Sequence, residues 1–353
     1  IDPKTVIIKD NSGLVVSSAA PSIPCEAITG ERFHIFCPFH DLKGYVETSF
    51  PQVLAAPETW FLNLETYFQY ADSVVDEKDV RSVLERARSA YLELLKNYVT
   101  GIVYGQEERS VSATKTIHPR PLDLNLRKEG RDFTYLGVTM TGFLRLDNVR
   151  QLLQDVSENQ IIGDYIETGV WRGGSSIFAR GVIRALNQGH RKSYVCDSFK
   201  GLPPGDRDLD KGDKNWNNWP YLEVSAEVVA GNFNSAGLLD SQVIFAKGFF
   251  NDTMPVLSPK IEALAIMRLD GDMYESTVDV LYHLYEKLSI GGYVIMDDWN
   301  GFPSRIACLD FFKAHDISPE IVPIDSLSIY WKKTEQIKVQ YWRYEQMQFT
   351  SEA

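Results

Sequence analysis

The sequence predicts an α/β fold in which a mostly parallel sheet carries helices on both faces. From residue 163 onward, short apolar runs alternate with longer amphipathic stretches, as expected for repeated strand–helix units. Several of the apolar runs end in acidic or glycine-rich segments: "ETGVWRGGSS", "VCDS", "RLDGDMYEST" and "VIMDDWN". Because open α/β sheets bind ligands at the carboxyl ends of their strands, these segments hold the candidate functional residues.

The composition is that of an ordinary globular protein. The chain has 353 residues, with 44% hydrophobic and 24% charged residues, which is enough for one large domain or two ordinary ones. The net charge of −12 argues against a nucleic-acid partner or an anionic membrane surface, since both need clusters of Lys and Arg. No apolar run approaches the roughly 18 residues of a membrane helix.

The compartment is predicted from the cysteines and the first residues. Cys25, Cys37, Cys196 and Cys308 have no framework spacing, so we interpret them as reduced thiols of a cytoplasmic protein. The polar start "IDPKTVIIKD" predicts no signal peptide. The first residue is Ile rather than Met, which is consistent with a fragment or a trimmed chain.

The first half of the chain is less regular. Residues 1–75 mix strand-like pieces with Pro and aromatic residues, and predict an N-terminal extension of unknown fold. Residues 76–100 predict a helix, because apolar side chains recur every three or four positions: Val80, Val83, Leu84, Ala87, Tyr91, Leu94, Leu95 and Tyr98. Residues 104–135 predict an exposed loop, and a short helix is expected near 145–156. We therefore expect a helical cap over 76–160.

The second half predicts a core over residues 161–335 and a tail over 336–353. The expected strands are "GDYIETG", "SYVCDS", "QVIFAKG", "EALAIMRLDG" and "GYVIMDD", with helices at 174–187, 222–236, 276–288 and 303–315 and only a short connection after the third strand. The last runs, "PEIVPI" and "LSIYWKK", leave no room for a helix between them and predict an antiparallel hairpin. A parallel sheet that ends in such a hairpin is similar to the arrangement of class I methyltransferases.

The glycine-rich segment predicts a ligand-binding turn between a strand and a helix. Gly169, Gly173 and Gly174 let the backbone turn tightly and approach a ligand, but their spacing is not G-x-G-x-x-G. Glu167 at the strand end suits the amino group of a methionine moiety better than a pyrophosphate, which an acid would repel. The alternative is an ordinary glycine-rich turn.

Asp197 ends the second strand of the core, 30 residues after Glu167. An acid at this position typically accepts hydrogen bonds from the ribose hydroxyls of an adenosine cofactor. The alternative is an Asp that stabilises a turn or caps a helix.

Three carboxylates predict a metal site. Asp270 ends the fourth strand, and Asp297 and Asp298 end the fifth. One right-handed crossover joins these strands, so they are expected to be neighbours whose carboxyl ends meet. Hard oxygen ligands suit Mg²⁺, and a cation would remove the repulsion between the acids. Asp272 and Glu275 are expected instead to cap the next helix or to face solvent, and the alternative for the whole group is ordinary strand-end turns.

The segment "NWNNWPY", residues 215–221, is aromatic and polar and lies beside the predicted site. Trp and Tyr stack on sugar or ring faces, so it predicts a substrate lid, and a packed loop is an equal alternative.

Together these segments resemble the macrocin O-methyltransferase family. The resemblance rests on "DYIETGVWRGGSSIFARGV", "CDSFKGLPP", "GFFNDTMP", "RLDGDMYESTVDVLYHLYEKLSIGGYVIMDDW" and "IDSLSIYW", with "TMTGFLRLDNV" and "YLELLKNYVTGIVY" before them, and spans about residues 88–333. Residues 1–75 and the loop around 206–220 depart from the family, and both regions would border the substrate.

The resemblance implies a class I, S-adenosylmethionine- and Mg²⁺-dependent O-methyltransferase that acts on deoxysugar hydroxyls of natural products and forms a homo-oligomer. It implies Asp270 as general base and metal ligand, together with Asp297 and Asp298. The implied cofactor residues are Glu167, Thr168, Gly169, Ser175, Asp197 and Ser198, with Thr139 and Met140 in a covering segment. Alternatives are methylation of a catechol or other vicinal phenol, a nicotinamide-dependent oxidoreductase, and a non-catalytic protein on the same fold.

Overall fold

The structure is a computed structural model that describes residues 5–10, 14–18, 33–34, 77–105, 107–111, 117–203, 210 and 220–340. The chain divides into two compact units, Ile1–Ser89 and Ala90–Ala353. The boundaries expected from the sequence at about 75, 160 and 335 remain predictions.

The first unit holds a small antiparallel sheet. Its described strands are β1 (Thr5–Asp10), β2 (Leu14–Ser18) and β3 (Phe33–His34), in the order β2-β1-β3. The helix α4 (Glu77–Val99) then leads into the second unit. The predicted helix at 76–100 is confirmed, and its predicted apolar face is wrong in part. Leu95 is buried as expected, but Leu94 is 62% exposed, and the buried stripe in the second unit also includes Leu92, Lys96 and Val99.

The second unit is built around a sheet with seven described strands. These are β6 (Asp164–Thr168), β7 (Ser193–Asp197), β8 (Val243–Lys247), β9 (Leu264–Leu269), β10 (Leu288–Met296), β11 (Val322–Pro323) and β12 (Ile329–Lys332). Their order is β11-β12-β10-β9-β6-β7-β8, parallel from β10 to β8 and antiparallel at β12 and β11. The predicted parallel sheet with a terminal antiparallel hairpin is confirmed.

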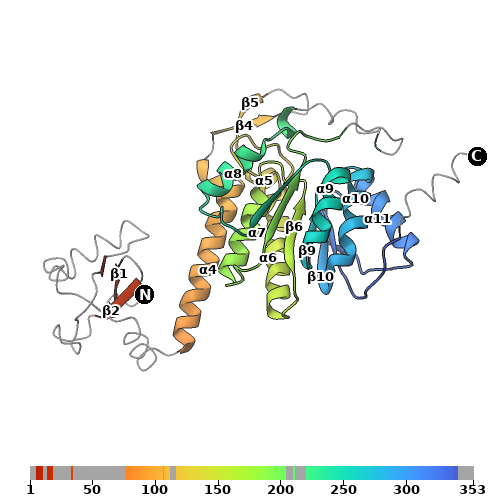
Figure 1. Cartoon of the computed structure of the whole chain (residues 1–353). Helices are drawn as coiled ribbons and strands as arrows, with labels where there is room; N and C mark the ends of the chain where they lie inside the picture. The colour runs from red at the N-terminus through yellow and green to blue at the C-terminus, as the bar shows by residue number, and fades with distance from the viewer. Residues whose placement is uncertain are drawn as a thin grey trace, which may run out of the picture. The chain divides into compact units, whose positions relative to one another are not determined.

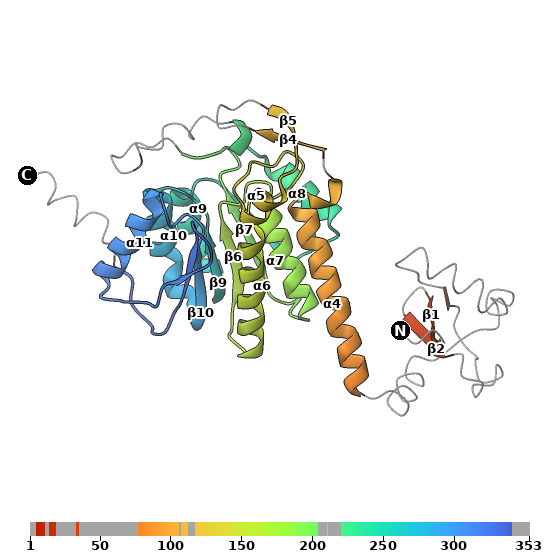
Figure 2. The same ribbon diagram turned by 180° about the vertical axis from the view of Figure 1, so that it is seen from behind.

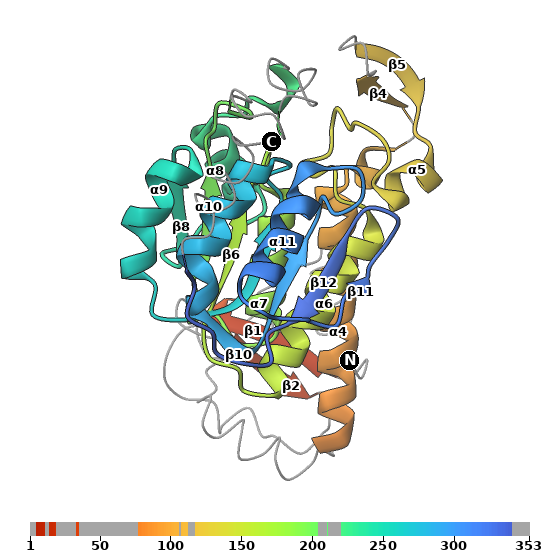
Figure 3. The same ribbon diagram turned by 90° about the vertical axis from the view of Figure 1, so that its right-hand side faces the viewer.

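Helices cover both faces of this sheet. α4, α6 (Phe143–Glu158), α7 (Gly174–Ala185) and α8 (Ala226–Ser235) contribute to one apolar core, and α9 (Phe250–Leu257), α10 (Tyr274–Leu284) and α11 (Pro303–Ala314) to the other. Figure 1 shows the two groups of helices on either side of the strands. In the view from behind in Figure 2, α4, α6 and α7 face the viewer, and in Figure 3 α10 and α11 do. Strands buried on both faces explain the continuous apolar runs in the sequence.

Two other expectations need correction. Residues 104–135 are not one exposed loop, since they include the hairpin β4 (Glu107–Val111) and β5 (Ile117–Pro121) and the helix α5 (Leu124–Glu129). The buried pair Arg127–Asp132 (2.9 Å) holds the end of this segment, and charged residues that pair in this way leave no apolar signal in the sequence. The connection after β8 is not short, because α9 and the turn Ser258–Lys260 follow it. Among the described helices, none combines the length and hydropathy needed to cross a membrane.

Candidate active site

The turn after β6 brings three backbone segments together at the carboxyl edge of the sheet. Gly169 has φ +90°, its N–H donates to the carbonyl of Cys196 at 2.8 Å, and a Cβ at this position would lie 1.8 Å from the carbonyl oxygen of Asp270. Only glycine therefore fits where β6, β7 and β9 end side by side. Trp171 follows with φ 48°, so the turn also needs an uncommon conformation of a bulky residue.

Asp197 holds this turn from the neighbouring strand. Its Oδ2 accepts the N–H groups of Val170 (2.7 Å) and Trp171 (3.3 Å), and its Oδ1 accepts the N–H of Phe199 (2.7 Å). Burial raises the pKa of Asp197, and these backbone donors oppose that shift. The turn-stabilising role is therefore present. Oδ1 also accepts the hydroxyl of Ser198 at 3.4 Å, so each oxygen has two donors, and this long contact is the weakest of the four.

Two cavities meet at this edge. The first, about 380 Å³, is lined from Phe249 and Asn251 after β8, past Asp197 and Gly169, to Asp270. The second, about 370 Å³, is lined by Phe133, Phe302, Arg145 and all three of the aspartates at the ends of β9 and β10. Both cavities share six lining residues: Met140, Trp171, Leu202, Leu222, Asp270 and Asp272.

The candidate cofactor residues are divided between these cavities. Gly169, Asp197 and Ser198 line the first, Glu167, Ser175 and Thr139 line the second, and Met140 lines both. Thr168 lines neither, and its hydroxyl donates to the carbonyl of Arg268 at 3.5 Å. The hydroxyl of Ser175 lies 3.1 Å from that of Thr139 and 2.8 Å from that of Thr141.

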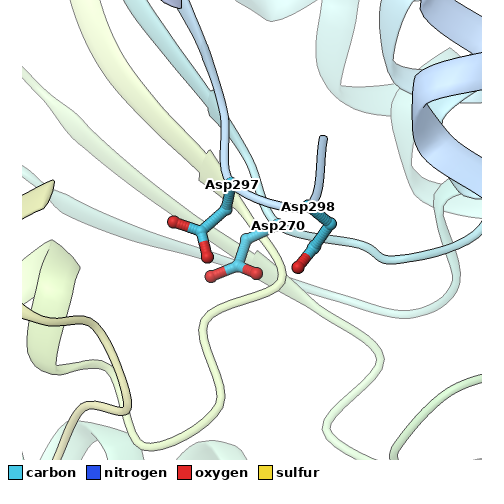
Figure 4. A group of neighbouring side chains, drawn as sticks. All are labelled: Asp270, Asp297 and Asp298. Atoms are coloured by element: carbon cyan, nitrogen blue, oxygen red, sulfur yellow. The ribbon is translucent and has the colours of Figure 1, made fainter. Parts of the chain in front are cut away.

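Asp270, Asp297 and Asp298 come together. One ligand atom from each of these side chains lies within 4.8 Å of the others. Among the described residues, this is the group of His, Cys, Asp or Glu side chains that could hold a metal ion. Figure 4 shows the three side chains next to one another at the ends of two neighbouring strands, with their carboxylates pointing to the same side. The register pairs Leu269 with Met296, so Asp270 and Asp297 directly follow paired residues.

Two buried arginines offset part of the electrostatic repulsion between these carboxylates. Arg268 Nη1 donates to Asp270 Oδ2 and to Glu167 Oε1, both at 2.6 Å, and Arg268 Nη2 donates to Asp297. Arg145 Nη1 donates to the other oxygen of Asp297 at 2.6 Å, and its Nε donates to Asp325 at 2.6 Å. The positive charge beside the aspartates therefore comes first from the protein itself.

The pKa shifts of the aspartates differ with their partners. Burial alone would raise the pKa of Asp297, but Arg145 and Arg268 hold it below its ordinary value. Burial and the charge of Asp297 raise the pKa of Asp270 against the opposing effect of Arg268. Burial and the charges of Asp272, Asp270 and Asp297 raise the pKa of Asp298 well above its ordinary value. Of the three, Asp298 is therefore the carboxyl group whose charged form the arginines stabilise least.

The charges fit a bound cation. Glu167, Asp270, Asp297, Asp298 and Asp325 are five carboxylates against the two guanidinium groups, an excess of three negative charges when all are ionised. A divalent ion offsets most of this excess, and carboxylate oxygens are the ligands that Mg²⁺ prefers. Arg268 contacts Asp270 through Oδ2, which leaves Oδ1 outside this hydrogen bond. Asp298 Oδ2 accepts the N–H of Asp272 at 3.2 Å.

Burial also sets the state of Glu167. Its side chain is 1% exposed, and burial raises its pKa to about 7 although Arg268 and the hydroxyls of Ser176 and Tyr165 favour the charged form. If Glu167 binds the amino group of a ligand as predicted, that amino group competes with Arg268, Ser176 and Tyr165 for the carboxylate oxygens.

The first turn of α10 is held by a residue that the sequence pattern does not reveal. Asp210 is 2% exposed and accepts the N–H groups of Tyr274 (2.7 Å) and Glu275 (3.3 Å). The expected capping by acids next to the helix is therefore wrong for these donors, since the cap comes from more than 60 residues earlier in the chain.

An aromatic wall joins the two cavities. The ring of Trp171 lies 5.1 Å from that of Tyr221, Tyr221 lies 6.0 Å from Phe133, and the guanidinium of Arg172 lies 4.3 Å from the ring of Trp171. Tyr221 is the described end of the aromatic segment at 215–221, whose first five residues lie outside the described part. Tyr221 packs in the manner of the packed-loop alternative, while Trp171 faces both cavities.

Arg145 and Arg268 are the functional residues that the sequence analysis missed. The charge inside the run "LAIMRL" was a usable signal for Arg268, because residues two apart in a strand lie on one face and Arg268 therefore points to the side of Asp270. Arg145 offered no signal, since it lies on α6 and reaches Asp297 only through the fold.

Comparisons with known proteins agree on one family. Residues 88–333 match the family model described as macrocin-O-methyltransferase (TylF). The chain is 41% identical over 250 residues to demethyldecarbamoylnovobiocin O-methyltransferase of Streptomyces niveus, covering 70% of this chain and 94% of that protein. It is 39% identical over 249 residues to mycinamicin III 3''-O-methyltransferase of Micromonospora griseorubida, covering 69% of this chain and 96% of that protein. The solved structure of the O-methyltransferase NovP is similar with a TM-score of 0.64 and 40% identity, covering 70% of this chain and all of that one.

Proposed function

Because the chain belongs to the macrocin-O-methyltransferase family and is an S-adenosylmethionine-dependent O-methyltransferase, we propose that it methylates a hydroxyl of a sugar on a glycosylated natural product, with Mg²⁺ bound at Asp270, Asp297 and Asp298. The observation that carries this proposal is the group of three aspartates on the second cavity, of which Asp270 also lines the first. The name of a further relative, the 8-demethyl-8-(2,3-dimethoxy-alpha-L-rhamnosyl)-tetracenomycin-C 4'-O-methyltransferase of Streptomyces olivaceus, which is 40% identical over 253 residues, supports a sugar acceptor.

We assign the cofactor to the first cavity. This cavity follows the carboxyl ends of β8, β7, β6 and β9, which is where a nucleoside lies in open α/β sheets. Asp197 and Ser198 both line this cavity, and the long 3.4 Å contact between them is the one that a ribose hydroxyl would replace. Met140, which lines both cavities, and Glu167, Ser175 and Thr139, which line the second, are assigned to the methionine end, where the cofactor would reach from the first cavity into the second. Gly169 is assigned to the close approach of the backbone. Thr168 is assigned only a supporting position beneath them.

We assign the acceptor to the second cavity. Phe133, Trp171 and Phe302 offer apolar walls of the kind that pack on the faces of sugar rings. The aspartate group lies on the same cavity, so a hydroxyl bound against these walls comes within reach of Asp270.

The chain's own residues can manage the proton of the acceptor hydroxyl. When bound, the cofactor supplies an electrophilic methyl group and the cation supplies positive charge that favours ionisation of a nearby hydroxyl. Asp270 accepts the hydroxyl proton as general base, since it lines both cavities and one of its oxygens is outside the contact with Arg268. Arg268 holds Oδ2 of Asp270 and so orients Oδ1 toward the cavity side.

The test is methyl transfer to matched acceptors. The full chain is incubated with S-adenosylmethionine and either deoxysugar glycosides or catechols, with Mg²⁺ or with EDTA, and the methylated product is measured. We expect methylated glycosides that form only with Mg²⁺, and loss of at least about a hundredfold in kcat for Asp270→Asn. Asp316→Asn is the control, because Asp316 is exposed and follows α11, and this variant should leave kcat unchanged.

Two outcomes would contradict the proposal. Methylation of catechols but of no glycoside would favour the vicinal-phenol alternative. Full activity in EDTA would remove the metal from the proposed function. The homo-oligomer implied by the resemblance remains a prediction, which sedimentation of the full chain tests.

A further inference from the structure

The side chain of Arg268 connects residues that belong to different parts of the proposed site. It is 0% exposed and lies in the central strand β9. Its Nη1 donates to Glu167 Oε1 on β6 and to Asp270 Oδ2 after β9, each at 2.6 Å. Its Nη2 donates to Asp297 after β10 and to the hydroxyl of Thr141 at 3.2 Å. One guanidinium therefore contacts both the group assigned to the cofactor and the group assigned to the cation.

The contacts divide evenly between the two groups. Glu167 and Thr141 line the second cavity beside Ser175, among the residues assigned to the methionine end of the cofactor. Thr141 pairs with Ser175 at 2.8 Å, and Glu167 accepts the hydroxyl of Ser176. Asp270 and Asp297 lie on the cation side. A guanidinium is planar and presents its donors in a rigid fork, so it cannot follow the carboxylates on one side without moving its donors on the other.

We propose that Arg268 is a positioning residue that couples cation binding to cofactor binding, so that each ligand tightens the binding of the other. This inference rests on the proposed function, because it takes Glu167 and Ser175 as the methionine end of the cofactor site and the aspartates as the cation site. A cation held by Asp270 and Asp297 fixes these two carboxylates, and through the fork it fixes Arg268, Glu167 and Thr141. The cofactor then meets a site that is already ordered, and preorganisation of this kind raises affinity.

The experiment is a thermodynamic cycle by isothermal titration calorimetry on the full chain. S-adenosylhomocysteine is titrated into metal-free protein and into protein saturated with Mg²⁺, and Mg²⁺ is titrated with and without saturating S-adenosylhomocysteine. This ligand lacks the sulfonium charge, which removes direct repulsion between two cations from the measurement. We expect S-adenosylhomocysteine to bind at least about fivefold tighter with Mg²⁺, and the reverse titration to give the same factor, as linkage requires.

Two variants separate coupling from stability. Arg268→Lys keeps the charge but cannot reach both sides at once, so both ligands should bind more weakly and the coupling factor should fall toward one. Arg145→Lys is the matched control, since the hydrogen bonds of Arg145 go to Asp297 and Asp325 and not to Glu167. It should weaken Mg²⁺ binding and keep the wild-type coupling factor. If the role of Arg268 were purely structural, Arg268→Lys would weaken the binding of both ligands and leave the coupling factor at its wild-type value.

A milder variant covers the case in which Arg268→Lys does not fold. Thr141→Val removes only the hydroxyl that accepts from Nη2 and that pairs with Ser175, so it should lower the coupling factor in part. The proposal is overturned if the wild-type ligands bind independently, or if Arg268→Lys, or Thr141→Val where that variant replaces it, keeps the wild-type factor. If S-adenosylhomocysteine does not bind at all, the proposed function fails and the coupling fails with it, whereas binding without an effect of Mg²⁺ refutes the coupling alone.

Discussion

The buried carboxyl group of Glu167 should make the metal-free protein less stable as the pH rises. In the folded chain this group is 1% exposed and its pKa is about 7, against an ordinary value of 4.5. Burial is the main cause, and Arg268 opposes it. The native state therefore binds this proton more tightly than the unfolded state does, and protonation favours folding.

The sign and the pH window follow from this difference. The stabilising effect is complete below the unfolded pKa of 4.5 and is lost as the pH rises through about 7. Since one pH unit corresponds to about 1.4 kcal/mol, the loss attributable to Glu167 is at most roughly 3 kcal/mol. Asp297 has a lowered pKa and its contribution changes only at lower pH, below its ordinary value of 3.8, so it does not overlap this window.

The assay compares urea unfolding of wild type and Glu167→Gln in EDTA at several values between about pH 5 and about pH 8. Gln has the shape of the neutral acid and does not titrate. The free energy of unfolding of wild type should fall relative to Glu167→Gln by roughly 1 to 3 kcal/mol across this range and become constant above it. Tyr165→Phe, which removes one hydroxyl donor to Glu167, should keep the pH dependence.

A difference between wild type and Glu167→Gln that stays flat with pH would refute the reasoning. So would a difference of the opposite sign, because it would mean that Arg268 outweighs burial and holds Glu167 ionised throughout.

Three other changes have expected outcomes. Asp298→Asn should raise the melting temperature in EDTA, because the pKa of Asp298 is raised and its charge is unfavourable there, and it should abolish the stabilisation by Mg²⁺; a lower melting temperature in EDTA would contradict this. Gly169→Ala should destabilise the protein by on the order of 3 kcal/mol, since its Cβ would lie 1.8 Å from the Asp270 carbonyl at φ +90°, whereas Gly231→Ala, with nothing within 4 Å, should be neutral or stabilising in the same thermal unfolding assay. Trp171→Ala should raise the KM of both cofactor and acceptor by about two- to tenfold, because Trp171 lines both cavities; an effect on one KM alone would show that it serves one ligand.

The sheet could be predicted because its signals are local. Apolar runs such as "LAIMRL" and "GYVIM" are continuous where strands are buried on both faces, and the spacing between them leaves room for helices except before β12. The segment at 104–135 and helix α9 were missed, since short helices and a polar hairpin have weak periodicity. The apolar face of α4 was misplaced for a similar reason, because Leu94 is exposed while Lys96 is buried beside Asp147.

The acidic members of the site were also accessible from the sequence. Parallel strands bring their carboxyl ends to one edge, so the order of the strands is enough to place Asp270 next to Asp297 and Asp298. Resemblance to a family added roles to these residues that spacing alone does not give.

Only the tertiary structure decided how the charges are balanced. Arg145 on α6, Arg268 on β9 and Glu167 on β6 come from distant parts of the sequence, and their hydrogen bonds depend on side-chain directions within the packed core. Electrostatic interactions act through space and are strong only where water is excluded, so distance and burial set their size and sequence separation does not. The sequence by itself determined the sheet, its ligand-binding edge and the acids on it; the fold decided which arginines face those acids and which carboxylate keeps its proton.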